Sequence, residues 1–272
     1  MTSGAIKTAY VPGVPRLAYD YAGAGAALIF LHGIGGYRGN WGRQLETLSG
    51  DYRAIAWDAR GYGESEDYAG DLDFADFTAD LERLLDHLGA DSAHICGLSM
   101  GGRIALDFHD HHPARVRSLI LVDTFPGFDD SFSQAGRERF VRERREPLVN
   151  GKEPADIAPQ VAPTLVSPTA SEAVIQELIE SMSLLHKASY LKTIEAMTMY
   201  RPVCDVSAIK VPVQIIVGAD DKLTPPSVSQ KMHGQIADSR LLVLEDTGHL
   251  SNLEKPQAVN DCIADFLRSI GT

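Results

Sequence analysis

Gly97-Leu98-Ser99-Met100-Gly101 is the stretch from which the fold of this chain follows. The apolar run before it, Ala93-His94-Ile95-Cys96, is typical of a buried strand. The apolar residues after it, Ile104, Ala105 and Phe108, have helical spacing. A Gly-x-Ser-x-Gly sequence between a strand and a helix is typical of a nucleophile elbow, a sharp turn that raises the serine hydroxyl above a sheet. This context favours Ser99 as a nucleophile over a merely structural turn.

Length and charge narrow the class of protein. The chain has 272 residues, enough for one α/β domain with an insertion. Its formal net charge of -12 disfavours partners that reward clustered Lys and Arg, namely nucleic acid and anionic membrane surfaces. No apolar run approaches the length of about 18 residues that predicts a membrane span, and residues 1–10 lack the apolar core of a signal peptide. We therefore expect a cytoplasmic protein and leave a homo-oligomer open.

The residue types that hold metals or cofactors do not occur in the required patterns. The chain has three cysteines, an odd number, and none of them is part of a Cys-x-x-Cys sequence. They are Cys96, Cys204 and Cys262. The histidines at 109, 111 and 112 do not have the spacing of a metal site. The glycine-rich turn at 32–36 has neither a Walker lysine nor the full Gly-x-Gly-x-x-Gly spacing. We expect neither a metal nor a cofactor.

Strand and helix patterns alternate along most of the chain. An antiparallel hairpin is expected from 6–11 and 16–21, followed by strands at 27–31, 53–57, 93–96, 116–122, 213–217 and 240–244. Helical patterns occupy 41–48, 74–88, the segment after Gly101, 227–236 and 256–270. This alternation predicts a mostly parallel, doubly wound sheet with right-handed crossovers.

The alternation stops between Pro126 and about Cys204, where helical patterns occur without a convincing strand. Residues 137–145 predict a solvated helix face, 147–168 are interrupted by prolines, and 171–185 and 186–200 predict two helices. We expect residues 1–125 and 205–272 to form the core, and 126–204 to form a helical lid inserted after the strand that ends near Asp123. The lid residues that could line a pocket or simply pack together are Met182, Leu185, Met197, Met199 and Tyr200, and His186 could face the substrate.

A serine, two adjacent aspartates and a histidine follow the carboxyl ends of three predicted strands. Ser99 follows one strand, Asp220 and Asp221 follow the strand at 213–217, and His249 follows the last strand. A serine hydroxyl needs a base in contact, and the base needs an acid that fixes its tautomer. Because the carboxyl ends of parallel strands share one edge of a sheet, we expect these groups to meet there.

The chain resembles the α/β-hydrolase fold superfamily over nearly its whole length, and is most similar to 3-oxoadipate enol-lactonases and related esterases. The resemblance rests on these motifs: His-Gly-Ile-Gly-Gly at 32–36 with Trp41, Asp-Ala-Arg-Gly-Tyr-Gly-Glu-Ser at 58–65, the elbow at 97–101, Gly-Ala-Asp-Asp at 218–221 with Pro225, and Gly248-His249. It implies an α/β-hydrolase fold, a mostly parallel doubly wound sheet with a helical lid.

The resemblance also implies roles for the residues of a catalytic triad. Ser99 would be the nucleophile and His249 the general base. The family pattern places the acid three residues after the glycine, which favours Asp221 over Asp220. Asp123 is a third candidate, because some members of this fold carry the acid after the earlier strand.

An oxyanion hole and a reaction follow from the same resemblance. The N–H groups of Ile34 and Met100 would bind the developing negative charge. The expected reaction is hydrolysis of a small carbonyl substrate, a carboxylic ester or a lactone such as an enol-lactone, through an acyl-enzyme on Ser99. The alternatives are hydrolysis of a C–C or amide bond in a ring-cleavage product, and a ligand-sensing receptor or regulator that keeps the fold.

Overall fold

The computed structural model describes residues 5–127, 134–199 and 204–271. Within them, eight strands form one sheet in the order β1-β2-β4-β3-β5-β6-β7-β8. The strands are β1 (Lys7–Val11), β2 (Leu17–Ala22), β3 (Ala27–Leu31), β4 (Arg53–Trp57), β5 (Ala93–Leu98), β6 (Val116–Val122), β7 (Val213–Gly218) and β8 (Ser239–Leu244). Neighbours from β4 to β8 are parallel, whereas β2 is antiparallel to β1 and β4. The predicted parallel sheet with an antiparallel hairpin at one edge is confirmed.

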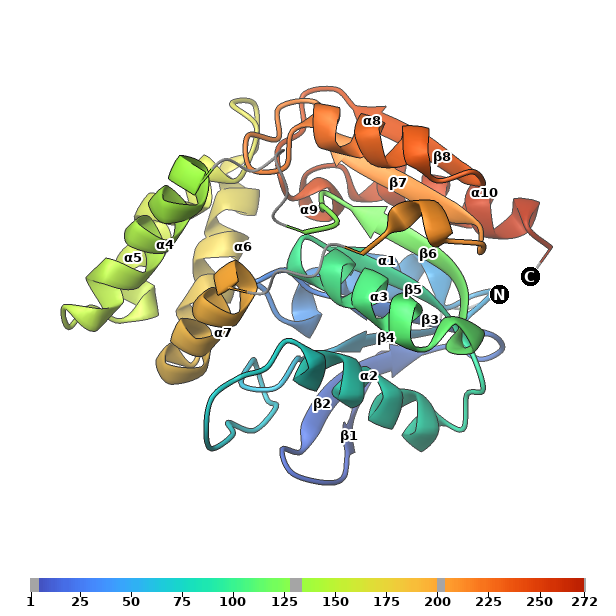
Figure 1. The fold of residues 1–272 in the computed structure, drawn as a ribbon, viewed down its shortest axis with the longest axis horizontal. Coiled ribbons are helices and arrows are strands. Elements are labelled where there is room, and N and C mark those ends of the chain that lie inside the picture. Colours follow the sequence, from blue (N-terminus) through green and yellow to red (C-terminus); the bar gives the residue numbers. More distant parts are fainter. Residues whose placement is uncertain (1–4, 128–133, 200–203, 272) are drawn as a thin grey trace.

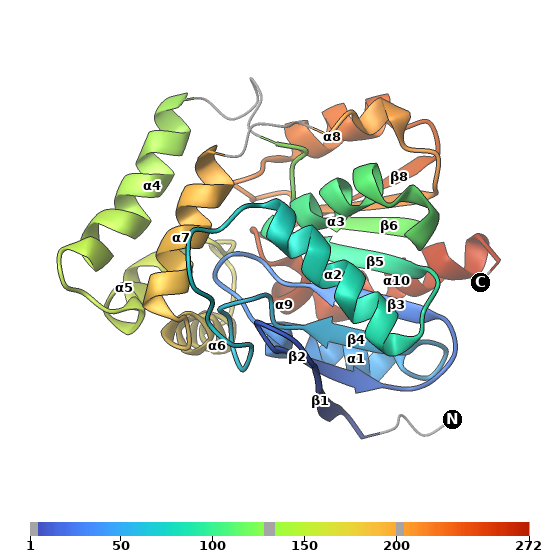
Figure 2. The same cartoon turned by 60° about the horizontal axis from the view of Figure 1, so that its bottom comes forward.

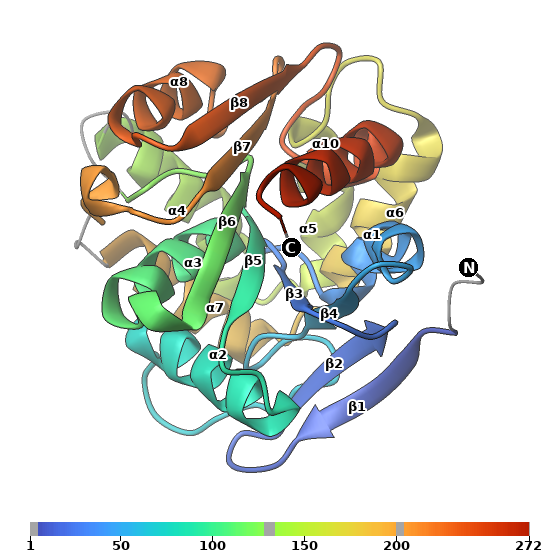
Figure 3. The same cartoon turned by 90° about the vertical axis from the view of Figure 1, so that its right-hand side faces the viewer.

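Helices cover both faces of the sheet, as Figure 3 shows. One face carries α1 (Gly42–Leu48) and α10 (Pro256–Ser269), and the other carries α2 (Ala75–Leu88), α3 (Met100–His111) and α8 (Pro226–Gln235). A short helix, α9 (Ser251–Glu254), precedes α10 and was not expected from the sequence. All five residues of β3 are buried, because a strand covered on both faces has no solvent side.

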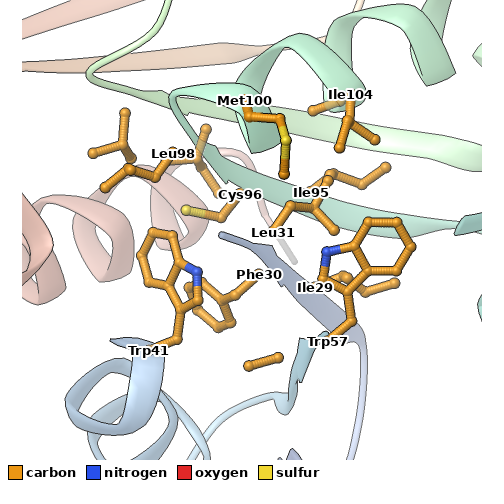
Figure 4. Packing of buried hydrophobic residues seen from close by; sticks show 14 of the residues in the cluster. Ile29, Phe30, Leu31, Trp41, Trp57, Ile95, Cys96, Leu98, Met100 and Ile104 are labelled. Atoms are coloured by element: carbon orange, nitrogen blue, oxygen red, sulfur yellow. The ribbon is translucent and has the colours of Figure 1, made fainter. Parts of the chain in front are cut away.

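The apolar core reaches the end of the sheet where the elbow lies (Figure 4). Phe30 of β3 packs against Trp41, with ring centroids 5.0 Å apart, and both side chains are fully buried. Trp41 ends the short 3₁₀ helix Arg38–Trp41 that follows the glycine-rich turn. Since close-packed interiors resist displacement, this contact holds the turn firmly on the sheet.

The remaining helices all lie between β6 and β7 in the sequence. They are α4 (Gln134–Val149), α5 (Pro154–Val161), α6 (Glu172–Ser183) and α7 (Lys187–Met199), and they form one group beside the sheet (Figures 1 and 2). Helix α5 falls in the proline-rich segment where no helix was predicted. It forms there because Pro154 is its first residue, a position that needs no N–H donor.

Candidate active site

Ser99 sits on a strained turn between β5 and α3. Its φ of 53° and ψ of -113° are uncommon for a residue other than glycine. Hydrogen bonds to both neighbouring segments hold it, among them one from its N–H to the Val122 carbonyl (3.0 Å) and one from Thr124 Oγ1 to its own carbonyl (2.6 Å). A Cβ on Gly101 would lie 2.1 Å from the Leu31 carbonyl oxygen, so only glycine fits there. The turn is therefore imposed by its packing against the neighbouring strands.

Asp221 and His249 form a buried hydrogen-bonded pair. His249 Nδ1 donates to Asp221 Oδ2 over 2.8 Å. Asp221 also accepts from the N–H groups of Leu223 (2.8 Å) and Thr224 (2.9 Å) and from Thr224 Oγ1 (2.6 Å). With its Nδ1 proton given to Asp221, His249 presents the lone pair of Nε2.

The pKa of His249 reflects two opposing effects. Burial by itself lowers the pKa of His249, but the charge of Asp221 and its hydrogen bond raise that pKa above the ordinary value of 6.5. The imidazolium is thus stabilised, which is what a general base needs once it has taken a proton.

The other two candidate acids form no hydrogen bond with His249 within the described residues. Asp220 is exposed, and its main-chain N–H donates to the Thr247 carbonyl. The Asp123 carboxyl group accepts from the N–H of Gly218 and from the N–H and hydroxyl of Ser251, which ties together the ends of β6 and β7 and the segment after His249. Burial and the nearby charge of Asp221 raise the pKa of Asp123 to about 7. Of the three carboxyl groups, it is that of Asp221 that accepts the His249 hydrogen bond.

The glycine-rich turn lies against Ser99. A Cβ on Gly33 would be 3.4 Å from the Ser99 Cβ. The turn is closed by a hydrogen bond from the Gly36 N–H to the Gly33 carbonyl (3.0 Å). Met100 is the first residue of α3, so its N–H has no acceptor inside the helix. The two residues expected to supply the oxyanion donors, Ile34 and Met100, thus adjoin Gly33 and Ser99 in the sequence, and Ile34 lines the same cavity as Ser99.

A small cavity of about 50 Å³ joins these groups to the inserted helices. Its walls include Ile34, Ser99 and His249 from the sheet side. Each of the four inserted helices also contributes to it: Phe140 and Arg144 from α4, Val161 from α5, Leu178 and Met182 from α6, and Tyr190 from α7. The segment between β6 and β7 thus lies over the space next to Ser99.

The predicted lid residues have different positions. Met182 lines the cavity, whereas Leu185 and Met197 are buried outside its wall. His186 binds the Asp67 carboxylate and the Gly63 carbonyl instead of facing the cavity. Tyr200 lies outside the described residues, as does the side chain of Met199.

The prediction of a solvated face for 137–145 is wrong for Arg144, which is 6% exposed. The buried side of α4 is a stripe of residues spaced four positions apart: Phe140, Arg144 and Leu148. The sequence carried a signal for this stripe, the spacing of Phe140 and Leu148, but five arginines around it favoured the solvated interpretation.

Thr224 and Tyr190 were also not anticipated. Thr224 had a detectable signal, since an aspartate often binds the backbone and hydroxyl groups two or three residues later in a turn. Tyr190 had none, because nothing in its helix distinguishes a cavity wall from helix packing.

The described part of the chain contains no group of three or more His, Cys, Asp or Glu side chains able to hold a metal ion. No helix in it is both long and apolar enough to cross a bilayer. Cys96, Cys204 and Cys262 are free thiols.

Comparisons with known proteins show the family and the fold of the chain. The model of the alpha/beta hydrolase fold family matches residues 26–256. The 3-oxoadipate enol-lactonase 2 of Acinetobacter baylyi is 30% identical over 259 residues, covering 93% of this chain and 94% of that protein. A malate-bound esterase from Thermogutta terrifontis superposes with a TM-score of 0.87 at 28% identity, covering 98% of this chain and all of that one. The enol-lactonase of Burkholderia xenovorans superposes with a TM-score of 0.83 at 25% identity, covering 96% and 100%.

Proposed function

We propose that this chain, which belongs to the α/β-hydrolase fold family, cleaves a carboxylic ester or lactone through an acyl-enzyme on Ser99. The observation that carries the proposal is the buried chain of Thr224, Asp221 and His249, which reaches the same cavity as the strained Ser99. Relatives named as an enol-lactonase and an esterase support the choice of an ester or lactone carbonyl.

In the proposed mechanism, His249 Nε2 takes the proton of the Ser99 hydroxyl while its oxygen attacks the carbonyl carbon. The oxyanion accepts hydrogen bonds from the N–H groups of Ile34 and Met100, and loss of one such donor typically costs about 3 kcal/mol in the barrier. His249 then gives the proton to the leaving oxygen and activates the water that releases the acyl group. In a lactone the leaving oxygen stays attached to the acyl chain, so the same groups serve both substrates.

The inserted helices α4 to α7 act in this proposal as a lid over a core formed by 1–125 and 205–272. All four helices contribute side chains to the cavity, so the lid sets the shape of the substrate. A cavity of about 50 Å³ favours a short acyl group or a compact ring.

A hydrolysis screen with wild type and Ser99→Ala tests the function. The substrates are a small aryl ester, an enol-lactone, an anilide and a ring-cleavage diketone. We expect turnover of the ester or lactone by wild type and loss of turnover in Ser99→Ala, with unchanged circular dichroism and melting temperature. A near wild-type rate in Ser99→Ala rejects the nucleophile. Turnover of the anilide or diketone alone would favour amide or C–C cleavage, and tight binding without turnover of any substrate would favour a sensor.

A further inference from the structure

Arg144 is a buried cation that has no carboxylate partner among the residues that the structure describes. It is 6% exposed, and its guanidinium lies 4.1 Å from the centroid of the Phe140 ring. Among the described residues, no Asp or Glu oxygen lies within ion-pair distance of it. Two other deeply placed arginines differ from it: Arg38 pairs with Asp58, and Arg60 pairs with Asp80.

The missing partner calls for an explanation. Removing a guanidinium from water is costly unless an anion compensates its charge. Burial lowers the pKa of Arg144, and the charge of Glu143, on the exposed side of α4, offsets this only in part. A residue needed only for packing would be apolar, as Phe140 and Leu148 are on the same stripe.

A second unused donor lies beside Arg144. Tyr190 of α7 is 1% exposed, lines the same cavity, and its hydroxyl forms no hydrogen bond with any described residue. The surrounding wall is apolar and includes Phe140, Val161 and Leu178. Next to this apolar part of the wall, two donors fit an acceptor that carries a full negative charge on a short hydrocarbon chain.

The cation shares its cavity with the reacting groups. Arg144, Ser99 and His249 all line it, and the charge of Arg144 acts on His249, where it disfavours the protonated imidazole. On its other side Arg144 lines a surface hollow with Arg139, Lys222 and Glu143, where the two basic residues outnumber the acidic one. Phe140, Arg144, Leu165 and Leu223 line both spaces, so the hollow leads an anion toward the cavity.

We propose that Arg144, together with Tyr190, binds a carboxylate group of the substrate, so that the ester or lactone bears a carboxylate remote from the carbonyl that Ser99 attacks. This inference rests on the proposed function and specifies its substrate class. The planar guanidinium can donate two parallel hydrogen bonds to a carboxylate, which fixes both the position and the orientation of the acyl chain. Arg144 is thereby a residue that determines specificity.

Two esters of equal length test the preference: 4-nitrophenyl hydrogen glutarate and its neutral methyl ester. Rates are corrected for uncatalysed hydrolysis with Ser99→Ala. We expect Arg144→Gln to lower the ratio of kcat/KM for the anionic over the neutral ester by about 10- to 100-fold, mostly through KM, since a charge-assisted hydrogen-bonded contact is lost. Arg144→Lys should retain part of the ratio, because it keeps the positive charge but loses the two parallel N–H donors of the guanidinium.

Arg145→Gln is the matched control, since it removes the same charge from an exposed neighbour on the same helix. It should leave the ratio unchanged. An unchanged ratio in Arg144→Gln, or an equal fall in Arg145→Gln, overturns the assignment.

Binding without turnover separates this inference from the proposed function. In Ser99→Ala, glutarate should raise the melting temperature more than sulfate does, and adding Arg144→Met should abolish that rise. Arg144→Met itself should melt no lower than its parent, because no ion pair is lost; a structural arginine would lower it. If glutarate binds but neither ester is hydrolysed, the proposed function is contradicted and the carboxylate site is not. Hydrolysis without glutarate binding, or equal stabilisation by sulfate, contradicts the carboxylate site alone.

Discussion

Asp221 shows how hydrogen-bond donors can surround a single carboxyl group inside the protein. A buried carboxylate is unfavourable unless donors replace the lost water. Two main-chain N–H groups, the Thr224 hydroxyl and His249 Nδ1 supply those donors. An amide at this position would present its NH₂ group to at least one of these donors, so its hydrogen bonds could not all form.

The choice between the adjacent aspartates can be tested directly. Asp221→Asn should lower kcat by about 10³- to 10⁴-fold, because the amide no longer fixes the tautomer of His249 or stabilises its protonated form. Asp220→Asn should leave kcat near the wild-type value, since Asp220 is exposed. Steady-state kinetics on one aryl ester measure both, and a larger loss in Asp220→Asn would move the acid to that position.

The pH dependence of the rate follows from the raised pKa of His249. His249 must be unprotonated to accept the serine proton, so kcat/KM should fall at low pH with a midpoint above 6.5. Loss of the Asp221 charge in Asp221→Asn should move the midpoint of the residual activity downward. A raised pKa also means that His249 stabilises the fold fully below pH 6.5 and loses this contribution as pH rises through its folded pKa.

A pH–rate profile of wild type and Asp221→Asn checks this expectation. A midpoint at or below 6.5 in wild type, or the same midpoint in both proteins, would show that Asp221 does not control His249.

At the scale of elements, the elbow depends on how closely α3 approaches β3. A methyl group on Gly101 would lie 2.1 Å from the Leu31 carbonyl, and backbone on both sides leaves little freedom to shift. Gly101→Ala should therefore destabilise the protein by about 1–3 kcal/mol or more and displace Ser99.

Gly42→Ala in α1 is the matched control, because a Cβ there meets nothing within 4 Å and its backbone is already helical. Urea unfolding and ester hydrolysis of both variants test the contact. Equal stability of the two variants would contradict the close packing of the elbow.

Sequence patterns predicted most elements because their physical causes are local. The continuous apolar run of β3 and the helical spacing of α2 each identify an element without reference to its neighbours. Helix α5 escaped prediction because its prolines suggest a loop, although Pro154 occupies the one helical position that suits it. The burial of Arg144 could not be predicted. Burial depends on which element packs against that face of the helix, and the composition of the helix does not show this.

At the scale of the whole molecule, α7 is fastened to the loop after β4. Ser189 Oγ donates to Asp67, and Lys192 donates to the Tyr68 carbonyl. Gly61 of that loop has a φ of 72°, and a Cβ on it would lie 2.3 Å from the Ser189 Cβ. The fit between α7 and the sheet domain thus requires glycine at 61.

Gly61→Ala should push α7 away from the loop and enlarge the cavity that Tyr190 lines. Gly70→Ala is matched in backbone strain, with a φ of 78°, but its Cβ would meet nothing within 4 Å. We expect faster amide exchange in α7 and a higher KM in Gly61→Ala than in Gly70→Ala. Equal exchange in the two variants would show that the contact does not hold the helix.

One part of the candidate site could be predicted from the sequence and another part could not. Ser99, Asp221 and His249 could be predicted to meet, because each follows a strand of a parallel sheet and such strands end at one edge. The cavity wall could not, because each of four helices, distant in sequence from Ser99, contributes only one or two residues to it. Tertiary packing therefore determines the cavity wall and with it the proposed substrate, whereas sequence motifs indicate the residues proposed to react.

Covalent trapping on Ser99 is the most direct test of the proposed reaction. Wild type is mixed with 4-nitrophenyl acetate, quenched in acid within the first turnover, and examined by intact mass and peptide mapping. We predict a burst of nitrophenol matched by one acetyl group on the peptide that contains Ser99, and neither burst nor acetyl group in Ser99→Ala. Turnover without an acetylated Ser99 peptide, or the same burst in Ser99→Ala, would contradict the account.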